Sequence, residues 1–118
     1  MADSPERPTY HETFAGGAQI IRWPHAHPLP EAEVLAFFSA RRIQSTRWSN
    51  DPCAVYEGHE HAYRKMLFCL VGGITFSLED GRDVTLAAGD RLIIPAGMRH
   101  GARVGPQGVV CIEGADSS

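Results

Sequence analysis

The sequence predicts an all-β sandwich or barrel that is preceded by an N-terminal arm and one helix. From about residue 45 onward, the helical period of apolar residues disappears. In its place, short strand-like segments recur at regular spacing, and most are separated by glycine-containing turn signals. Many short strands broken by such turns are typical of a β-sandwich or barrel, so a helix-rich fold is excluded for this part of the chain.

The N-terminal part of the chain has a different composition. Residues 1–29 contain several prolines and the pair Gly16-Gly17, with few apolar clusters. This composition predicts an arm with one short strand over residues 19–23. We therefore divide the chain into an arm over residues 1–29 and a β-barrel domain over residues 30–118, which includes the helix.

One amphipathic helix is predicted over residues 30–41. Pro30 suits the helix start, and acidic residues follow in the first turn. Arginines stand near the carbonyl end, where positive charge is favourable. The expected apolar stripe consists of Val34, Leu35, Phe37 and Phe38.

The remaining elements are predicted to be strands. Their turn signals include Asn50-Asp51-Pro52, Gly72-Gly73 and Gly105-Pro106. The strands are expected over residues 45–49, 54–57, 65–71, 74–78, 83–86, 91–95, 101–104 and 109–113.

Composition excludes several classes of function. The 118-residue chain has 14 acidic and 11 basic residues, for a formal net charge of −3. Nucleic acids and anionic membranes require a basic surface, so neither is an expected partner. The longest apolar run, residues 66–71, is too short to cross a bilayer. The first ten residues lack the apolar core of a signal peptide, so we expect a cytoplasmic location.

Cysteine usage agrees with a reducing compartment. The chain has three cysteines and no C-x-x-C pair. Cys69 and Cys111 lie in apolar runs, which favours buried free thiols over a disulfide framework.

Two histidines are the first candidates for chemistry. His59 and His61 are two residues apart, and in a strand that spacing places both side chains on one face. Two such imidazoles can chelate one ion of zinc, iron, nickel, copper or manganese. The pattern alone is a weak signal, because His25 and His27 repeat it within the proline-rich arm, where we do not expect a metal.

A second segment strengthens the case for the first pair. Residues 89–100 read G-x5-P-x-G-x2-H and end at His100. Together with the earlier histidines and Gly72, this segment resembles the cupin superfamily. The two signatures of that superfamily are G-x5-H-x-H-x3–4-E-x6-G and G-x5-P-x-G-x2-H-x3-N. The final asparagine position holds Val104.

The resemblance implies a double-stranded β-helix, the jelly-roll cupin barrel, with a metal site in the mouth of the barrel. It assigns roles as ligands of a divalent transition metal to His59, His61 and His100. Small barrels of this superfamily commonly pair, so it also implies a homodimer and a small-molecule ligand or substrate. The strand in the arm is a candidate for addition to a neighbour's sheet edge.

One departure from the family pattern concerns a ligand position. The glutamate position of the first signature holds Lys65, and strand parity places Lys65 and Tyr63 on the same inward face as the histidines. Three alternatives stay open. In the first, three histidines alone form the site. In the second, Lys65 is neutral or turned outward, or it pairs with an anionic substrate or takes part in proton transfer. In the third, the barrel has lost its metal.

These residues lead to two hypotheses of function. The first is a metal-dependent enzyme, with oxygenase or isomerase chemistry on a small organic substrate, in which Lys65 and Tyr63 are candidate catalytic residues. The second is a non-catalytic small-molecule-binding cupin with a structural metal or none. One fold hosts both functions, so the fold cannot separate them.

Overall fold

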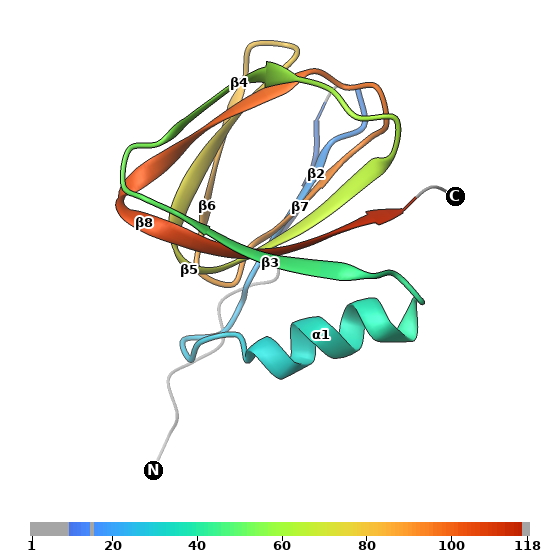
Figure 1. The fold of residues 1–118 in the computed structure, drawn as a ribbon, viewed down its shortest axis with the longest axis vertical. Coiled ribbons are helices and arrows are strands. Elements are labelled where there is room, and N and C mark those ends of the chain that lie inside the picture. The colour runs from blue at the N-terminus through green and yellow to red at the C-terminus, as the bar shows by residue number, and fades with distance from the viewer. Residues whose placement is uncertain (1–9, 15, 117–118) are drawn as a thin grey trace.

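The structure, a computed structural model, describes residues 10–14 and 16–116. It confirms the predicted all-β architecture with one helix (Figure 1). Every strand pair is antiparallel. The elements are, in chain order, β1 (Tyr10–Thr13), β2 (Gln19–Arg22), α1 (Glu31–Ala40), β3 (Ser45–Asn50), β4 (Val55–His59), β5 (Arg64–Leu78), β6 (Asp83–Ala87), β7 (Arg91–Ile94) and β8 (His100–Asp116).

Two long strands, β5 and β8, form the frame of the barrel. They pair with each other from Arg64 opposite Asp116 to Leu78 opposite His100. The first half of β5 also pairs with β7, and its second half pairs with β6. In the same way β8 pairs with β4 near its start and with β3 near its end. The sheet therefore curls around a closed interior, as Figure 1 shows.

Each long strand replaces two strands of the prediction. The Gly72-Gly73 pair was expected to be a turn, but it lies inside β5, at an irregularity in the pairing with β8. Gly72 has a φ of +78°, and a Cβ there would come within 2.0 Å of the carbonyl oxygen of Gly108. The predicted turn at Gly105-Pro106 likewise lies within β8, where the strand leaves its register with β5 between Val104 and Val109. The turn residues thus bend continuous strands instead of ending them.

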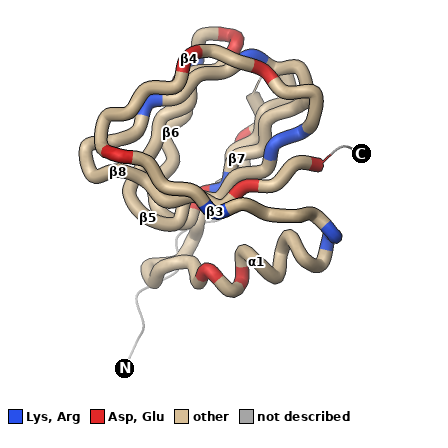
Figure 2. The backbone as a smooth tube through the Cα atoms, in the orientation of Figure 1, with Lys and Arg blue, Asp and Glu red and all other residues tan. Residues whose placement is uncertain are grey.

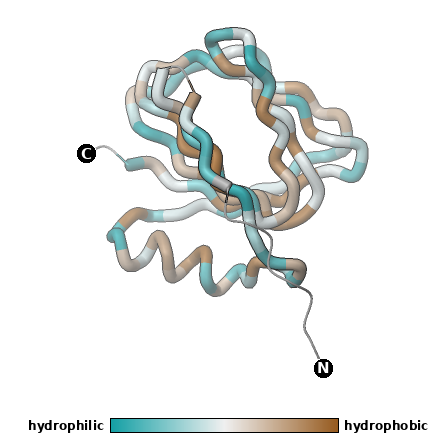
Figure 3. The backbone as a smooth tube through the Cα atoms, turned by 180° about the vertical axis from the view of Figure 1, so that it is seen from behind, coloured by the Kyte–Doolittle hydropathy of each residue, from teal (hydrophilic) through white to brown (hydrophobic). Residues whose placement is uncertain are grey.

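Apolar residues form one cluster on each face of the large sheet. The inner cluster fills the barrel and includes Leu67, Leu86 and Leu92, none of which is exposed. The outer cluster joins the sheet to α1 through Phe38 and Phe68. Figure 3 shows hydrophobic stretches along the strands that enclose the barrel and along the helix.

The helix matches its predicted range to within one residue at each end. Its first turn carries acidic residues, and basic residues follow its C-terminus (Figure 2). Arg41 caps the C-terminus and donates from Nη1 to the carbonyl oxygen of Phe37. The predicted apolar stripe is wrong at one position: Leu35 is 45% exposed, whereas Val34 and Phe38 are buried.

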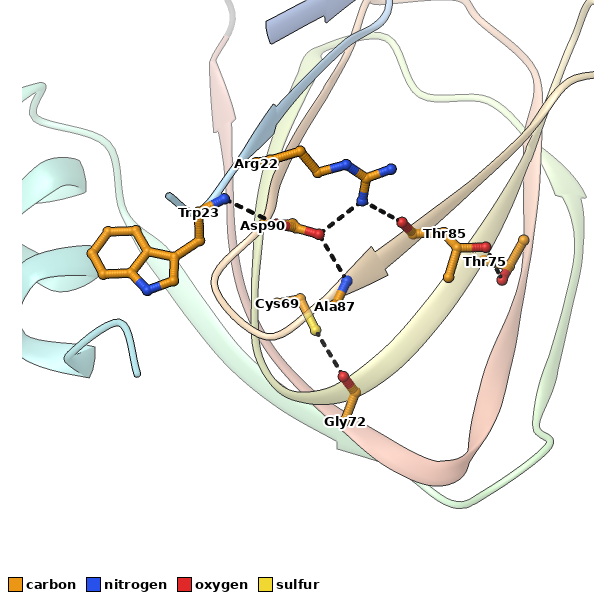
Figure 4. A network of polar contacts seen from close by, with 8 residues as sticks. All are labelled: Arg22, Trp23, Cys69, Gly72, Thr75, Thr85, Ala87 and Asp90. Atoms are coloured by element: carbon orange, nitrogen blue, oxygen red, sulfur yellow. Dashed lines mark hydrogen bonds and ion pairs between the residues drawn. The ribbon is translucent and has the colours of Figure 1, made fainter. Parts of the chain in front are cut away.

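The arm is part of the same sheet. Its strand β2 pairs with β7 of its own chain, where we had expected addition to a neighbour's edge, and β1 pairs with β2. Asp90 fastens this junction, as Figure 4 shows: its carboxylate accepts from Arg22 Nη1 at 2.8 Å, the Trp23 amide at 3.0 Å and the Ala87 amide at 2.9 Å. Residues 1–9 of the predicted arm lie outside the described part of the chain.

The cysteines are free thiols. Cys69 and Cys111 face each other across the β5–β8 pair, and both are buried, as the sequence predicts. Cys53 is exposed. Of the helices in residues 10–14 and 16–116, none has the length and apolar character needed to cross a membrane.

Candidate metal centre

Three histidines meet at one end of the barrel. His59 is the last residue of β4, and His100 is the first residue of β8. The two are direct partners across the β4–β8 pair. His61 follows in the connection to β5, and one ring nitrogen from each histidine lies within 4.8 Å of the other two. Within the described residues this is the only such cluster of three or more metal-binding side chains.

The predicted arrangement of the first two histidines needs one correction. The expected one-face arrangement holds only within a strand, but β4 ends at His59 and His61 lies beyond it. The pairing of β4 with β8 is already irregular between Tyr56 and His59. His61 is therefore positioned by the β4–β5 connection. The backbone carbonyl oxygen of His61 accepts a hydrogen bond from the Gly97 amide at 2.8 Å.

Backbone hydrogen bonds set the tautomer of two of the rings. His59 Nδ1 lies 2.8 Å from the carbonyl oxygen of Glu57, and His100 Nδ1 lies 3.0 Å from that of Met98. A carbonyl only accepts, so both Nδ1 atoms carry the proton and donate it. In this tautomer the lone pair that can bind a metal ion lies on Nε2, as in many metal-binding histidines.

The surroundings keep two of the rings neutral. Burial lowers the pKa of His100 from its ordinary value of 6.5 to about 4, with a smaller contribution from nearby His59 and Lys65. Burial also lowers the pKa of His61, and Lys65 adds to that effect. A histidine must be neutral to bind a metal, so neither ring needs to lose a proton at neutral pH.

The residues present fit a metal ion. The Nε2 atoms of His61 and His100 are buried and have no hydrogen-bond partner. Buried polar atoms without a partner are rare in folded proteins. Here two of them belong to the same cluster, and a bound cation would satisfy both.

A cavity of about 330 Å³ opens beside this cluster inside the barrel. His59 and His61 line it on one side, and its remaining walls include Trp48, Ile74 and Phe76. Such a cavity, largely apolar with a few polar groups, is typical of a small-molecule site.

Lys65 lines the same cavity and is not alone there. Only 11% of its side chain is exposed, and Nζ lies 3.5 Å from Oε1 of Glu113 on β8. The indole nitrogen of Trp48 donates to the same carboxylate oxygen at 2.7 Å. Glu113 thus holds a lysine and a tryptophan side chain within the cavity.

Glu113 and Trp48 were not among the candidate site residues. Aromatic residues in strands usually pack in the core, so the sequence around Trp48 gives no sign that it lines a site. For Glu113 a signal existed, because it lies two residues after the inward-facing Cys111 on the same strand. An acidic residue on the inner face of a barrel requires a partner.

Tyr63 lies at the edge of the cluster. Its ring stacks on that of His61, with the centroids 4.7 Å apart. It contacts a candidate metal ligand and is not among the residues that line the cavity.

A curled antiparallel sheet with converging histidines beside an interior cavity defines a small jelly-roll protein with a candidate metal centre. The family model described as "Cupin domain" matches residues 49–112, more than half of the chain. The chain belongs to the cupin family.

Solved structures give the same fold at low sequence identity. An RmlC-like cupin from Shewanella frigidimarina is 21% identical, with a TM-score of 0.57 over 93% of this chain and 85% of that one. RmlC from Streptococcus suis, solved with dTDP-D-xylose, is 14% identical, with a TM-score of 0.67 over 95% of this chain and 71% of that one.

An enzyme of known reaction is also among the similar structures. Salicylate 1,2-dioxygenase from Pseudoaminobacter salicylatoxidans, solved with gentisate, is 9% identical, with a TM-score of 0.57. The match covers 63% of this chain and only 20% of that one, so it shows the fold alone. No curated protein matches the chain.

Proposed function

We propose that the protein binds one divalent transition metal ion through His59, His61 and His100 and acts on a small organic substrate in the adjoining cavity. The observation that carries this proposal is the convergence of three ring nitrogens within 4.8 Å, two of them buried without a partner. Iron, manganese, nickel, copper and zinc all accept imidazole ligands. When bound, such an ion polarises or activates the groups that occupy the coordination positions left open by the histidines.

Lys65 is the candidate for binding the substrate's charged group. Its ammonium group faces the cavity and contacts one oxygen of Glu113 at 3.5 Å. That distance is longer than a charge-assisted hydrogen bond, so Lys65 retains donors for an entering carboxylate or enolate. Glu113 holds the lysine beside the cluster, and its carboxylate can accept a proton from the lysine. We therefore assign substrate binding or proton transfer to Lys65, and positioning of Lys65 to Glu113.

The apolar walls favour a substrate with a flat or hydrophobic body. Trp48, Ile74 and Phe76 line the cavity beside the lysine and the histidines, and a substrate that fills the cavity would displace water from these walls. Exclusion of water strengthens the electrostatic interactions inside a site. Among reaction classes we favour oxygenase or isomerase chemistry, because three histidines leave coordination positions open for a substrate, water or oxygen.

A second candidate function is a non-catalytic small-molecule-binding cupin. The observation that favours it is Lys65, which places a positive charge where the family pattern has a carboxylate ligand. An ammonium group beside a divalent cation is repulsive and weakens metal binding.

Metal analysis of protein purified without a histidine tag or a chelator tests the proposal. We expect about one transition-metal ion per chain, and none in the variant His59→Ala/His100→Ala. The second H-x-H pair of the chain offers a matched control: His25→Ala/His27→Ala removes two histidines and leaves the metal content unchanged. Equal metal content in both double variants would overturn the assigned site.

Oxygen uptake separates the enzyme from the binder. After anaerobic loading with Fe²⁺, the wild-type protein is expected to consume oxygen when a set of aromatic and hydroxy acids is added, and the Lys65→Met variant is expected to lose this response. Saturable substrate binding without turnover under any metal would favour the non-catalytic function.

The proposal includes a cytoplasmic homodimer. Strand β1 stands at one end of the strand order, and the edge of a sheet is a common site of pairing between copies. Sedimentation analysis of the purified chain measures the oligomeric state directly.

A further inference from the structure

A second cavity lies on the opposite side of the large sheet from the histidines. It has a volume of about 290 Å³ and is enclosed by α1, the segment after β2 and the outer face of β5 and β7. Its walls are mainly apolar, and the aromatic side chains of Trp23, Phe37 and Phe68 contribute to them. Figure 1 shows α1 lying across this outer face of the barrel.

Arg91, at the start of β7, brings a positive charge into this apolar layer. Its guanidinium carbon lies 5.0 Å from the ring centroid of Phe37 and 5.4 Å from that of Phe68. The Nε atom is buried and has no hydrogen-bond partner. Cation–π contacts hold the guanidinium in place, but they leave its N–H groups without acceptors.

The nearby carboxylates do not neutralise Arg91. Asp90, the adjacent residue, already accepts from Arg22 and from two backbone amides (Figure 4). Glu33 lines the cavity but is exposed and forms no ion pair with Arg91. A second guanidinium, that of Arg41, lies 3.6 Å from the centroid of the Phe37 ring and increases the local positive charge.

A half-buried arginine without an anionic partner, such as Arg91, raises the free energy of the folded protein unless a ligand binds to it. Buried charges in proteins are normally paired, because removing them from water is unfavourable. An arginine presents a planar fork of donors that matches a carboxylate in a bidentate manner. The cavity therefore combines a free donor fork with aromatic walls for an apolar body.

We propose that this outer cavity is a binding site for a small aromatic carboxylate, with the carboxylate on Arg91 and the ring packed against the side chains of Trp23, Phe37 and Phe68 that line it. The volume is at the lower end of the range for ligand pockets, so it suits a ligand of about one ring. This site is separate from the candidate metal centre, and the proposal does not rest on the proposed function.

Titration with benzoate tests the site. Isothermal titration calorimetry of the protein as purified is expected to show saturable binding, and the neutral isostere benzamide is expected to bind at least about tenfold more weakly, because a hydrogen bond to a charged group is lost. The variant Arg91→Gln is expected to weaken benzoate binding by about tenfold or more. Arg103→Gln is the matched control, since it removes the same charge from an exposed position on β8 and should leave the affinity unchanged.

Two further variants keep the test decisive. Arg91→Lys retains the charge but not the fork, so we expect an intermediate affinity. His59→Ala/His100→Ala removes the candidate metal centre, so any benzoate binding that this variant loses belongs to that centre, and the binding that it keeps but Arg91→Gln loses belongs to the outer cavity. Equal binding by Arg91→Gln and the wild type would overturn the proposal, as would loss of binding in the histidine variant alone or the absence of saturation up to ~10 mM, which corresponds to negligible affinity.

Discussion

The chain contains the pattern histidine–any residue–histidine twice, and the imidazole rings of the two pairs are arranged differently. The rings of His25 and His27 stack on each other with centroids 5.0 Å apart, and both meet the edge of Trp23. The rings of His59 and His61 meet at 4.9 Å with an interplanar angle of 75°. The first two rings are nearly parallel, whereas His59 and His61 each bring one ring nitrogen within 4.8 Å of a nitrogen of His100.

Strand pairing, and not the pattern itself, makes the difference. The register of β4 with β8 brings His100 directly opposite His59, so a third nitrogen donor joins the second pair. The first pair lies between Pro24 and Pro28, outside any strand, and no third ligand joins it in the described part of the chain. Local sequence spacing thus brings together two nitrogen ligands at most. The third ligand comes from a distant segment through strand pairing.

Replacing one histidine in each pair is expected to give the largest difference, which is in zinc affinity. His61→Gln removes one of three proposed ligands, and we expect it to weaken zinc binding about a thousandfold, because structural zinc sites are worth roughly 10–16 kcal/mol in total and each ligand carries a share of ~4 kcal/mol. His27→Gln makes the same chemical change in the first pair and should leave zinc affinity unchanged. Competition against a chelator of known affinity measures both. A similar loss in the two variants would show that the pairs are equivalent.

The surroundings of the two pairs should also differ in how pH affects the free energy of unfolding, because only the second pair lies beside His100. The pKa of His100 is lowered to about 4 in the folded protein, below its ordinary value of 6.5, so between these pH values the unfolded chain binds more protons. The stability that comes from neutral His100 is therefore fully present above about pH 6.5 and is lost as the pH falls toward 4. At pH 5 the metal-free protein should be about 2 kcal/mol less stable than at pH 7 on this account.

Urea unfolding at both pH values checks this prediction. His100→Gln should remove most of the pH-dependent difference, whereas His27→Gln, at an exposed position, should retain it. A pH dependence that persists in full in His100→Gln would assign the effect to other groups.

Much of the fold was predictable because its signals are local. Alternation of apolar residues marks the strands, and the position of Pro30 with Glu31 and Glu33 marks the helix. The position of Lys65 followed from counting residues along one strand. Gly72-Gly73 and Gly105-Pro106 were misread as turns because glycine marks both hairpins and bulges. Only the approach of β8 to Gly72 distinguishes the two.

The missing site residues depend on contacts between distant segments. Glu113 and Lys65 are far apart in the sequence and meet because β5 pairs with β8. Trp48 reaches the same carboxylate from β3, on the other side of β8. No local pattern specifies which carboxylate will face which cation, so this part of the cavity required the structure. The same is true of Arg91, whose aromatic neighbours come from α1 and β5.

Lys65 offers a way to strengthen the second pair instead of disrupting it. Lys65→Glu replaces a repulsive ammonium group with a carboxylate beside His61, so we expect metal binding to tighten by about tenfold or more, equivalent to ~1.4 kcal/mol. Activity on an anionic substrate should fall in the same variant, because the substrate loses its positive partner. Lys65→Met separates the two effects, since it removes the repulsion without adding a ligand. Equal metal affinity in all three proteins would show that Lys65 has no influence on the metal centre.

The smallest effect is expected from the first pair when no metal is present. The side chain of His27 is exposed, and the hydrogen bond from the Trp23 indole nitrogen goes to the backbone oxygen of His27 at 2.7 Å, which alanine retains. His27→Ala should therefore lower the free energy of unfolding by only about 0.5 kcal/mol, the usual size for a surface substitution. Urea unfolding with and without zinc gives the measurement, and the loss should be the same in both conditions. A loss that is larger only when zinc is present would mean that the first pair binds the ion in the folded protein, because a ligand stabilises the state that binds it. In that case the proposed difference between the two pairs would be wrong, since the first pair would bind metal without a third histidine.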